Sequence, residues 1–435
     1  MFASKNSQIR QTGQTAPTRA LVEISAGLTT FVAMVYVLAA NPMILGLAGL
    51  PQSAVFTATA LGTILATLIM AFYANLPFAV APGMGLNVFF MILVTQMGYS
   101  PAQAITAVLV SGSVFFLLSL SPLRQKFLDE IPQCLRLAVS SGVGLMIAYI
   151  GLYNSAVVVS TPSGPGLGNL TQGPALLAVL GLFVLGALLA LRFRYAVLAG
   201  VIITTLIGLP LGVTRTEALS AGIFSPPPAL EGLVFNFDFT ILGSWGFWSL
   251  VVTLLIMEFI DGLAGFLGLF SVMGAEAERY KHKLGRAFVA DSLGVVVGSC
   301  LGLSPNTTYC ESGTGVAVGG RTGLTAVTVA VCFFFALFIS PLFLMVPAAA
   351  VAPALVLVGL LMLSSVAKIN FQDFSESFPV FLVLLMITLT WRISDSLAVG
   401  WLAYALMKIL MGRAQTLTPT VWVGSIIFGL KLFWL

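Results

Sequence analysis

Charged side chains are scarce in this sequence, and the shortage excludes a water-soluble globular protein. Asp, Glu, Lys and Arg make up 8% of the 435 residues, whereas a soluble domain has about 25%. Hydrophobic residues make up 59% of the chain, so too few polar side chains remain to cover a surface that faces water. We therefore expect the surface to face lipid.

The residues that most catalytic and metal sites require are also missing. The single histidine, His282, lies between two lysines in what we interpret as a solvated loop. The four cysteines form no CxxC pair, so neither a disulfide framework nor a metal site is expected. The sequence has no P-loop and no nucleophile paired with a histidine base. We expect no enzyme, no cofactor and no ATP-driven pump, and the modest net charge of +4 does not indicate nucleic-acid binding.

Long apolar runs, in contrast, are abundant. Runs of about 20 residues, long enough to cross a bilayer as a helix, recur along the chain. We predict fourteen spans in two sets of seven, separated by a less apolar stretch at 213–240. The first set is 21–47, 53–74, 79–97, 101–120, 133–158, 174–191 and 195–212; the second is 243–270, 285–302, 305–320, 322–345, 347–366, 374–390 and 394–412. A last apolar stretch, 420–435, is compatible with an interfacial helix or with an extra span.

The basic residues support this count and give an orientation. With the N-terminus in the cytoplasm, Arg215 and Arg392 are the only assigned basic residues on the outer side. Cytoplasmic loops of membrane proteins carry an excess of Lys and Arg, and a miscount by one span would remove this bias. We therefore predict a multi-pass protein of a cytoplasmic membrane with a cytoplasmic N-terminus.

The two sets of spans resemble each other weakly. Pro132 precedes Gly144 by the same interval that separates Pro347 from Gly359. Because seven is an odd number, two similar sets must have opposite orientations in the membrane, and inverted repeats are typical of secondary transporters. The predicted fold is therefore an all-α polytopic membrane protein with two inverted seven-helix repeats.

The third and tenth spans are broken at corresponding positions. Each has a proline, a short extended piece and a Gly-x-Gly: Gly83-Met84-Gly85 in one and Gly313-Thr314-Gly315 in the other. Non-helical backbone at membrane depth is stable only where protein or a wet cavity satisfies its polar groups. We predict short strands in both spans, followed by half-helices whose free N–H groups face a substrate. Gly83 and Ser312, at the starts of these half-helices, are candidate binding residues.

Carboxylates within spans are further candidates, because an ionisable group in a membrane is costly. Glu258 and Asp261 lie three residues apart and so share one helix face, and Glu311 lies at the break of the tenth span. The amide of Asn87 can donate and accept at once, which suits the edge of a heterocycle, or it can form a polar contact between helices. We interpret Asp291, near the predicted cytoplasmic end of its span, as structural.

Several segments recur in one family of transporters. They are Thr29-Thr30-Phe31, Ala81-Pro82-Gly83-Met84-Gly85-Leu86-Asn87, the Glu258/Asp261 segment, Thr307-Thr308-Tyr309-Cys310-Glu311-Ser312 and Gly319-Gly320-Arg321-Thr322-Gly323-Leu324-Thr325. On these segments the chain resembles the AzgA-like purine permeases of the nucleobase–cation symporter 2 family over roughly residues 19–412.

The resemblance implies a domain organisation in which a core domain moves against a gate domain. The implied parts are a cytoplasmic N-terminus at 1–20, core segments 21–120 and 243–345, gate segments 121–212 and 346–412, an external connector at 213–242 and a C-terminal apolar segment at 413–435.

The resemblance also implies uptake of adenine, guanine or hypoxanthine with a proton, by alternating access. It implies that Glu258 and Glu311 bind the base, and that Asn87 supports the site. Asp261 would serve binding or coupling, and any of the three carboxylates could carry the proton, because burial and a neighbouring like charge both disfavour the charged form of a carboxyl group.

The chain departs from the family pattern near these residues. The family usually has Asp where Glu258 stands, and Asp-Thr-x-Gly-Thr where this chain has Asp261-Gly262-Leu263-Ala264-Gly265. Substrate preference therefore stays open, with uracil, xanthine or an anion as alternative cargo. Na⁺ is the alternative coupling ion. A membrane-embedded enzyme or receptor is the alternative class of protein. Glu311 argues against an anion. A homodimer is also left open.

Overall fold

The computed structural model describes residues 16–121, 132–161, 164–193, 195–214, 216–217, 222–230, 232–390 and 393–434. Arg215 and Arg392, which the charge count assigns to the outer side, lie outside these residues.

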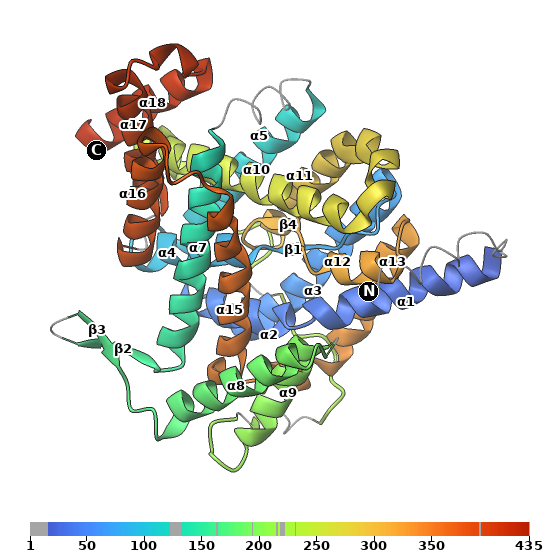
Figure 1. Cartoon of the computed structure of the whole chain (residues 1–435). Helices are drawn as coiled ribbons and strands as arrows, with labels where there is room; N and C mark the ends of the chain where they lie inside the picture. Colours follow the sequence, from blue (N-terminus) through green and yellow to red (C-terminus); the bar gives the residue numbers. More distant parts are fainter. Residues whose placement is uncertain are drawn as a thin grey trace.

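Helices dominate the described chain (Figure 1). The α-helices of the first half are α1 (Ala16–Met34), α2 (Val37–Leu47), α3 (Gln52–Ile69), α4 (Met84–Thr95), α5 (Pro101–Leu120), α7 (Gln133–Asn154), α8 (Gly173–Ala190) and α9 (Ala196–Ile207). Those of the second half are α10 (Trp245–Met273), α11 (Leu284–Cys300), α12 (Ser312–Val318), α13 (Gly323–Ala336), α14 (Ser340–Leu344), α15 (Ala348–Leu363), α16 (Phe374–Thr390), α17 (Ile393–Leu410) and α18 (Pro419–Trp434). The strands are β1 (Val80–Pro82), β2 (Val158–Thr161), β3 (Gly164–Leu167) and β4 (Asn306–Thr308).

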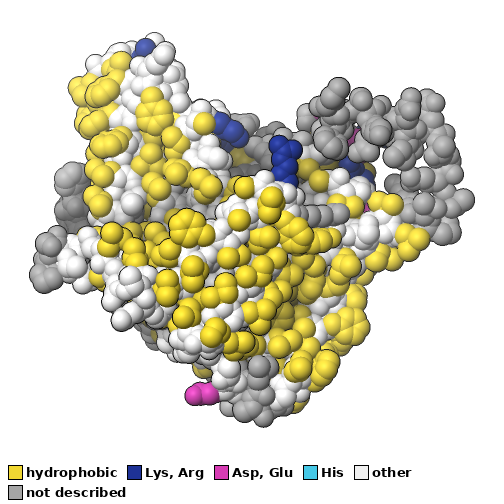
Figure 2. Space-filling view, turned by 60° about the horizontal axis from the view of Figure 1, so that its bottom comes forward, with side chains coloured by type: hydrophobic (Ala, Val, Ile, Leu, Met, Phe, Trp, Pro, Cys, Tyr) yellow, Lys and Arg dark blue, Asp and Glu magenta, His cyan; other side chains and the backbone are white. Residues whose placement is uncertain are grey.

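The predicted helical membrane protein is confirmed. Each predicted span coincides with at least one helix, and within the described residues eight helices are long and apolar enough to cross a membrane. Figure 2 shows a face dominated by hydrophobic side chains, with few charged ones. Large apolar side chains such as Phe72, Phe183 and Phe335 are exposed, as expected for a surface in contact with lipid.

The first predicted span is one helix in the sequence but two in the structure. α1 ends at Met34, and a turn at Val35-Tyr36 leads into α2, which contains Pro42. Pro42 removes the N–H that would bond to the carbonyl of Leu38, so its effect falls within α2 and not at the interruption itself. Tyr36 lies at the interruption and is buried within the molecule.

The helices pack mainly within two groups. In one, α5 packs on α10 and α11, α3 packs on α11 and α13, and α1 packs on α12 and α13. In the other, α7 packs along α15 and α16, α15 packs on α8 and α9, and α17 packs on α16 and α18. Figure 1 shows α7 and α15 side by side. The two groups meet where α4 lies against α7 and α2 against α15.

The two glycines of the repeated Pro–Gly interval face each other where α7 and α15 pack. A Cβ atom on Gly144 would lie 2.7 Å from the carbonyl oxygen of Gly359. The absence of side chains therefore permits the close approach of the two helices. The weak sequence echo between the halves thus marks a contact between them.

Candidate functional site

The two broken spans meet through their strands. β1 and β4 pair antiparallel, with Val80 opposite Thr308, Ala81 opposite Thr307 and Pro82 opposite Asn306. The prediction of short strands in spans 3 and 10 is confirmed, and the pairing shows that each strand satisfies the backbone of the other. Figure 1 shows the pair near the middle of the molecule.

Side chains complete the hydrogen bonding around β1. The hydroxyl of Thr67 on α3 accepts from the Val80 N–H at 3.0 Å and donates to the Val80 carbonyl at 3.1 Å. The N–H of Ala79 donates to Oγ of Ser312 at 3.0 Å. Polar backbone at this depth is therefore satisfied by protein, as the membrane requires.

The candidates at the half-helix starts occupy matching places. Gly83 directly precedes α4, and its N–H donates to the carbonyl of Pro305 at 3.0 Å. Ser312 is the first residue of α12, is fully buried and holds β1 through Ala79. The structure thus brings Gly83 and Ser312 to the strand pair, from opposite halves of the chain.

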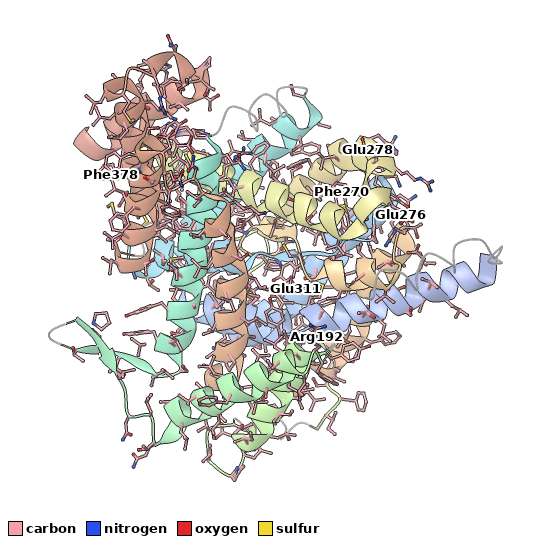
Figure 3. The ribbon with its side chains drawn as sticks, viewed as in Figure 1. Arg192, Phe270, Glu276, Glu278, Glu311 and Phe378 are labelled. Atoms are coloured by element: carbon pink, nitrogen blue, oxygen red, sulfur yellow. The ribbon has the colours of Figure 1, made fainter. Side chains whose placement is uncertain are left out.

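Glu311 directly precedes α12, near the middle of the molecule (Figure 3). The hydroxyl of Tyr36 donates to its Oε1 at 2.9 Å. The neighbouring Cys310 is exposed and Glu311 itself is partly exposed. A carboxylate at a half-helix start is therefore partly accessible and is oriented by one phenol. Sequence reasoning missed Tyr36, because a single tyrosine in an apolar span carries no signal of its partner.

Glu258 lies on α10 with 1% of its surface exposed. Its Oε1 accepts from the hydroxyl of Ser111 on α5 at 2.8 Å, and its Oε2 has no hydrogen-bond partner among the described residues. Asp261, one turn further along α10, is partly exposed. Ser111 was also missed, because serines are common in the small-residue interfaces of membrane helices.

Asp291 on α11 lies beside β4. Its Oδ1 accepts from the hydroxyl of Thr308 at 2.7 Å, and within the described part of the chain its Oδ2 has no partner. A Cβ atom on Gly262 would lie 2.9 Å from that oxygen. Gly262 directly follows Asp261, so Asp291 faces the turn of α10 that carries Asp261. The structure therefore places a third carboxylate beside this turn.

Asn87 is fully buried in the first turn of α4. Its Oδ1 accepts from the hydroxyl of Ser304, which lies just before β4, and its Nδ2 lies 3.8 Å from Sδ of Met84. The amide thus forms a polar contact between the two broken spans, which is one of the two roles considered from the sequence.

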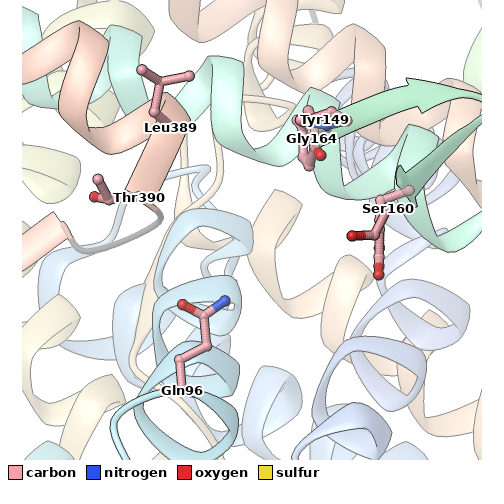
Figure 4. Close-up of a pocket in the computed structure, with 8 residues that line it drawn as sticks. Gln96, Tyr149, Ser160, Gly164, Leu389 and Thr390 are labelled. Atoms are coloured by element: carbon pink, nitrogen blue, oxygen red, sulfur yellow. The ribbon is translucent and has the colours of Figure 1, made fainter. Parts of the chain in front are cut away.

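A cavity of about 290 Å³ lies apart from these residues, at the far end of α4 (Figure 4). Its lining includes Gln96 after α4, Tyr149 on α7 and Thr390 at the end of α16. Near the start of α4, Gly85 lies against Val143 of α7.

Comparison with known proteins identifies the family. Residues 21–427 match the Permease family (Xan_ur_permease). The adenine permease AdeP of Escherichia coli K12 is 38% identical over 428 residues, covering 98% of this chain and 94% of that protein. The guanine/hypoxanthine permease PbuO of Bacillus subtilis 168 is 39% identical over 420 residues, covering 94% and 96%.

A solved structure confirms the fold. The transmembrane domain of the cyanobacterial bicarbonate transporter BicA superposes with a TM-score of 0.64 at 16% identity, covering 87% of this chain and 97% of that domain. The resemblance to purine permeases drawn from the motifs is confirmed by the named relatives. The chain therefore belongs to the Permease family and is a multi-pass membrane transporter, not an enzyme.

Proposed function

We propose that the protein imports purine nucleobases by proton symport with alternating access. The observation that carries the proposal is the placement of Glu311 directly before α12, whose start is joined to the start of α4 by β1 and β4. A purine is flat, neutral and edged with donors and acceptors. Carboxylates accept from its N–H groups. The expected free N–H groups are not found at the start of α12, where the N–H groups of Ser312, Gly313 and Thr314 donate to the carbonyl oxygens of Tyr309, Cys310 and Glu311. Relatives named as adenine and guanine/hypoxanthine permeases support this cargo.

The proposed binding residues are Glu258, Glu311, Asn87, Gly83 and Ser312. Glu311 binds the base directly, because it is partly exposed beside Cys310. Asn87 and Ser312 support the site by holding the broken spans together through Ser304 and Ala79. Glu258 offers an oxygen that has no partner in the described structure.

The alternating movement is proposed to occur between the core segments 21–120 and 243–345 and the gate segments 121–212 and 346–412. The two packing groups of helices support this division, because they follow the same boundaries. The contact of Gly85 with Val143 lies where the two parts meet. The antiparallel strands at equivalent places in the two halves support the inverted repeat.

Proton coupling is proposed to involve Asp261, Glu258 or Glu311. No ion pair joins these carboxylates to a basic residue among the described residues. Symport of a neutral purine with one proton moves one positive charge inward, so the membrane potential contributes about 2.3 kcal/mol per 100 mV. The same carboxylates are chemically able to bind Na⁺, so the test must distinguish a proton gradient from a Na⁺ gradient as the driving force.

The test is uptake of labelled adenine and hypoxanthine into proteoliposomes under imposed gradients, with competition by a panel of bases. Wild-type protein is expected to accumulate purine with an inward proton gradient, and Glu311→Gln liposomes serve as the matched control. Accumulation driven by Na⁺ alone would overturn the proton mechanism. Thermal stabilisation by anions or uracil, and not by purines, would overturn the cargo.

A further inference from the structure

The turn between α12 and α13 carries a set of polar contacts that the proposed function does not use. α12 has seven residues, and helices shorter than about 12–15 residues are marginal by themselves. Its last carbonyl groups have no partner within the helix. Because α12 begins beside Glu311, anything that fixes its far end also sets the position of that carboxylate.

Arg321 supplies partners at this far end. Its Nη1 donates to the carbonyl oxygens of Val316 at 2.6 Å and Gly320 at 2.7 Å, and its Nε donates to Oε2 of Glu276 at 2.6 Å. A cation at a helix C-terminus is favourable because it opposes the partial negative charge there. Glu276 lies in the 3-10 helix η5 (Gly274–Arg279), which follows α10. Arg321 therefore connects the end of α12 to the end of α10.

Glu23 on α1 supplies the complementary charge. It is 3% exposed, and its two oxygens accept from the backbone N–H of Arg321, each at 3.2 Å. Its Oε2 also accepts from the Thr322 N–H at 3.1 Å and from the Thr325 hydroxyl at 2.5 Å. An anion at the N-terminus of α13 satisfies donors that have no partner within that helix. One short turn is thus fixed by a cation at the end of α12 and by a buried anion at the start of α13.

We propose that Glu23, Arg321 and Glu276 are positioning residues for the substrate site, and we call them the Glu23–Arg321–Glu276 network. The inference rests on the proposed function, because it assigns the network to the placement of Glu311. Seven helical residues span about 10 Å, or about two turns, so the network acts at short range through one short helix. Figure 3 shows Glu276 at the end of α10 and Glu311 further into the molecule.

The geometry requires arginine and not merely a positive charge. The guanidinium group presents a planar fork of donors, whereas a lysine presents one compact ammonium group. Arg321 uses two different nitrogens to reach a carboxylate and two carbonyl oxygens. Arg321→Lys is therefore expected to impair the site. The charge exchange Arg321→Glu/Glu276→Arg is also expected to leave the site impaired, because a carboxylate at position 321 cannot donate to the carbonyl of Val316.

The test uses Cys310 as a reporter that needs no substrate. Cys310 is exposed and directly precedes Glu311. In the reporter background the other three cysteines are replaced by alanine. The full-length protein in detergent is labelled with a maleimide, and the rate is compared among the reporter background, Arg321→Lys, Glu23→Gln and the charge exchange. Purine affinity is measured by calorimetry on the same samples. Arg286→Ala is the matched control, because Arg286 is an exposed basic residue on α11.

The network variants are expected to change the ligand-free labelling rate and to weaken purine binding by about tenfold or more, the scale of a lost charged hydrogen bond. Arg286→Ala is expected to match the background in both. Unchanged labelling in all network variants, or full recovery by the charge exchange, would overturn the inference. If the wild type binds no purine, the proposed function fails, while the labelling rates still decide whether the network sets the position of α12.

Discussion

The hydroxyl of Tyr36 donates a 2.9 Å hydrogen bond to Oε1 of Glu311, a residue 275 positions away in the chain. The bond joins the bend between α1 and α2 to the start of α12. It occupies one oxygen of the carboxylate and so orients the other. The first span, which the sequence presents as an uninterrupted apolar helix, thus contributes to the candidate site through the interruption at Val35-Tyr36.

Replacement of Glu311 by Gln is expected to abolish measurable purine binding while the protein still folds. Loss of a hydrogen bond to a charged group costs about 1.5–3 kcal/mol, and the amide cannot accept at both positions. Calorimetry on purified protein measures the affinity, and thermal unfolding without ligand controls for folding. Wild-type affinity in this variant would remove Glu311 from the site.

Tyr36→Phe is expected to weaken purine binding by about 1 kcal/mol, the net contribution of one hydrogen bond. The same change in the Glu311→Gln background is expected to add little, because the phenol acts through the carboxylate. A double-mutant cycle of the free energies of binding measures this coupling. Independent, additive effects would show that Tyr36 contributes separately from Glu311.

Asn87→Ala is expected to change the order of preference among competing bases more than it changes stability. Ser304→Ala removes the donor to the Asn87 side chain and is the matched comparison. If Asn87 acts by joining the broken spans, both variants shift the competition profile in the same way. A profile that neither variant alters would restrict Asn87 to helix packing.

Cys310 is expected to react with thiol reagents, and purine is expected to slow the reaction. Cys310 is exposed beside Glu311, whereas Cys134 is buried and should stay unmodified in the folded protein. The measurement is the rate of modification at each cysteine by mass spectrometry, with and without adenine. Equal rates at Cys310 in both conditions would place the purine elsewhere.

Single cysteines introduced at 222–230 and at 279–286 are expected to be labelled from opposite sides of the membrane. This follows from seven spans in each half and from the basic residues of the 279–286 segment. Impermeant labelling of intact cells and of inverted vesicles gives the sides. Labelling of both segments from one side would contradict the inverted repeat.

The helical fold and the two breaks could be predicted because their signals are local. Apolar length identifies a span, and the paired Pro and Gly-x-Gly elements identify the places where α4 and α12 begin. Glu258 and Glu311 could be selected because a carboxylate in a membrane is unusual in itself. Each of these inferences needs only residues that are neighbours in the chain.

The partners of those residues could not be predicted, because they depend on tertiary contacts. Tyr36, Ser111 and Thr308 are ordinary residues of membrane helices and strands until the fold brings them to Glu311, Glu258 and Asp291. Asp291 illustrates the limit. Its position near a predicted span end indicated a structural role, and only the packing of α11 against β4 shows how close it lies to the site.

The antiparallel pairing of β1 with β4 also sets a condition on how the protein is made. Val80 pairs with Thr308, so more than two hundred residues must be synthesised before the partner strand exists. At roughly 5–20 residues per second, this takes on the order of 10–45 s. Unpaired backbone groups are costly in hydrocarbon, so the third span is expected to remain beside the insertion machinery until the tenth span emerges. We therefore expect insertion of this carrier to be completed only when the three residue pairs between β1 and β4 can form.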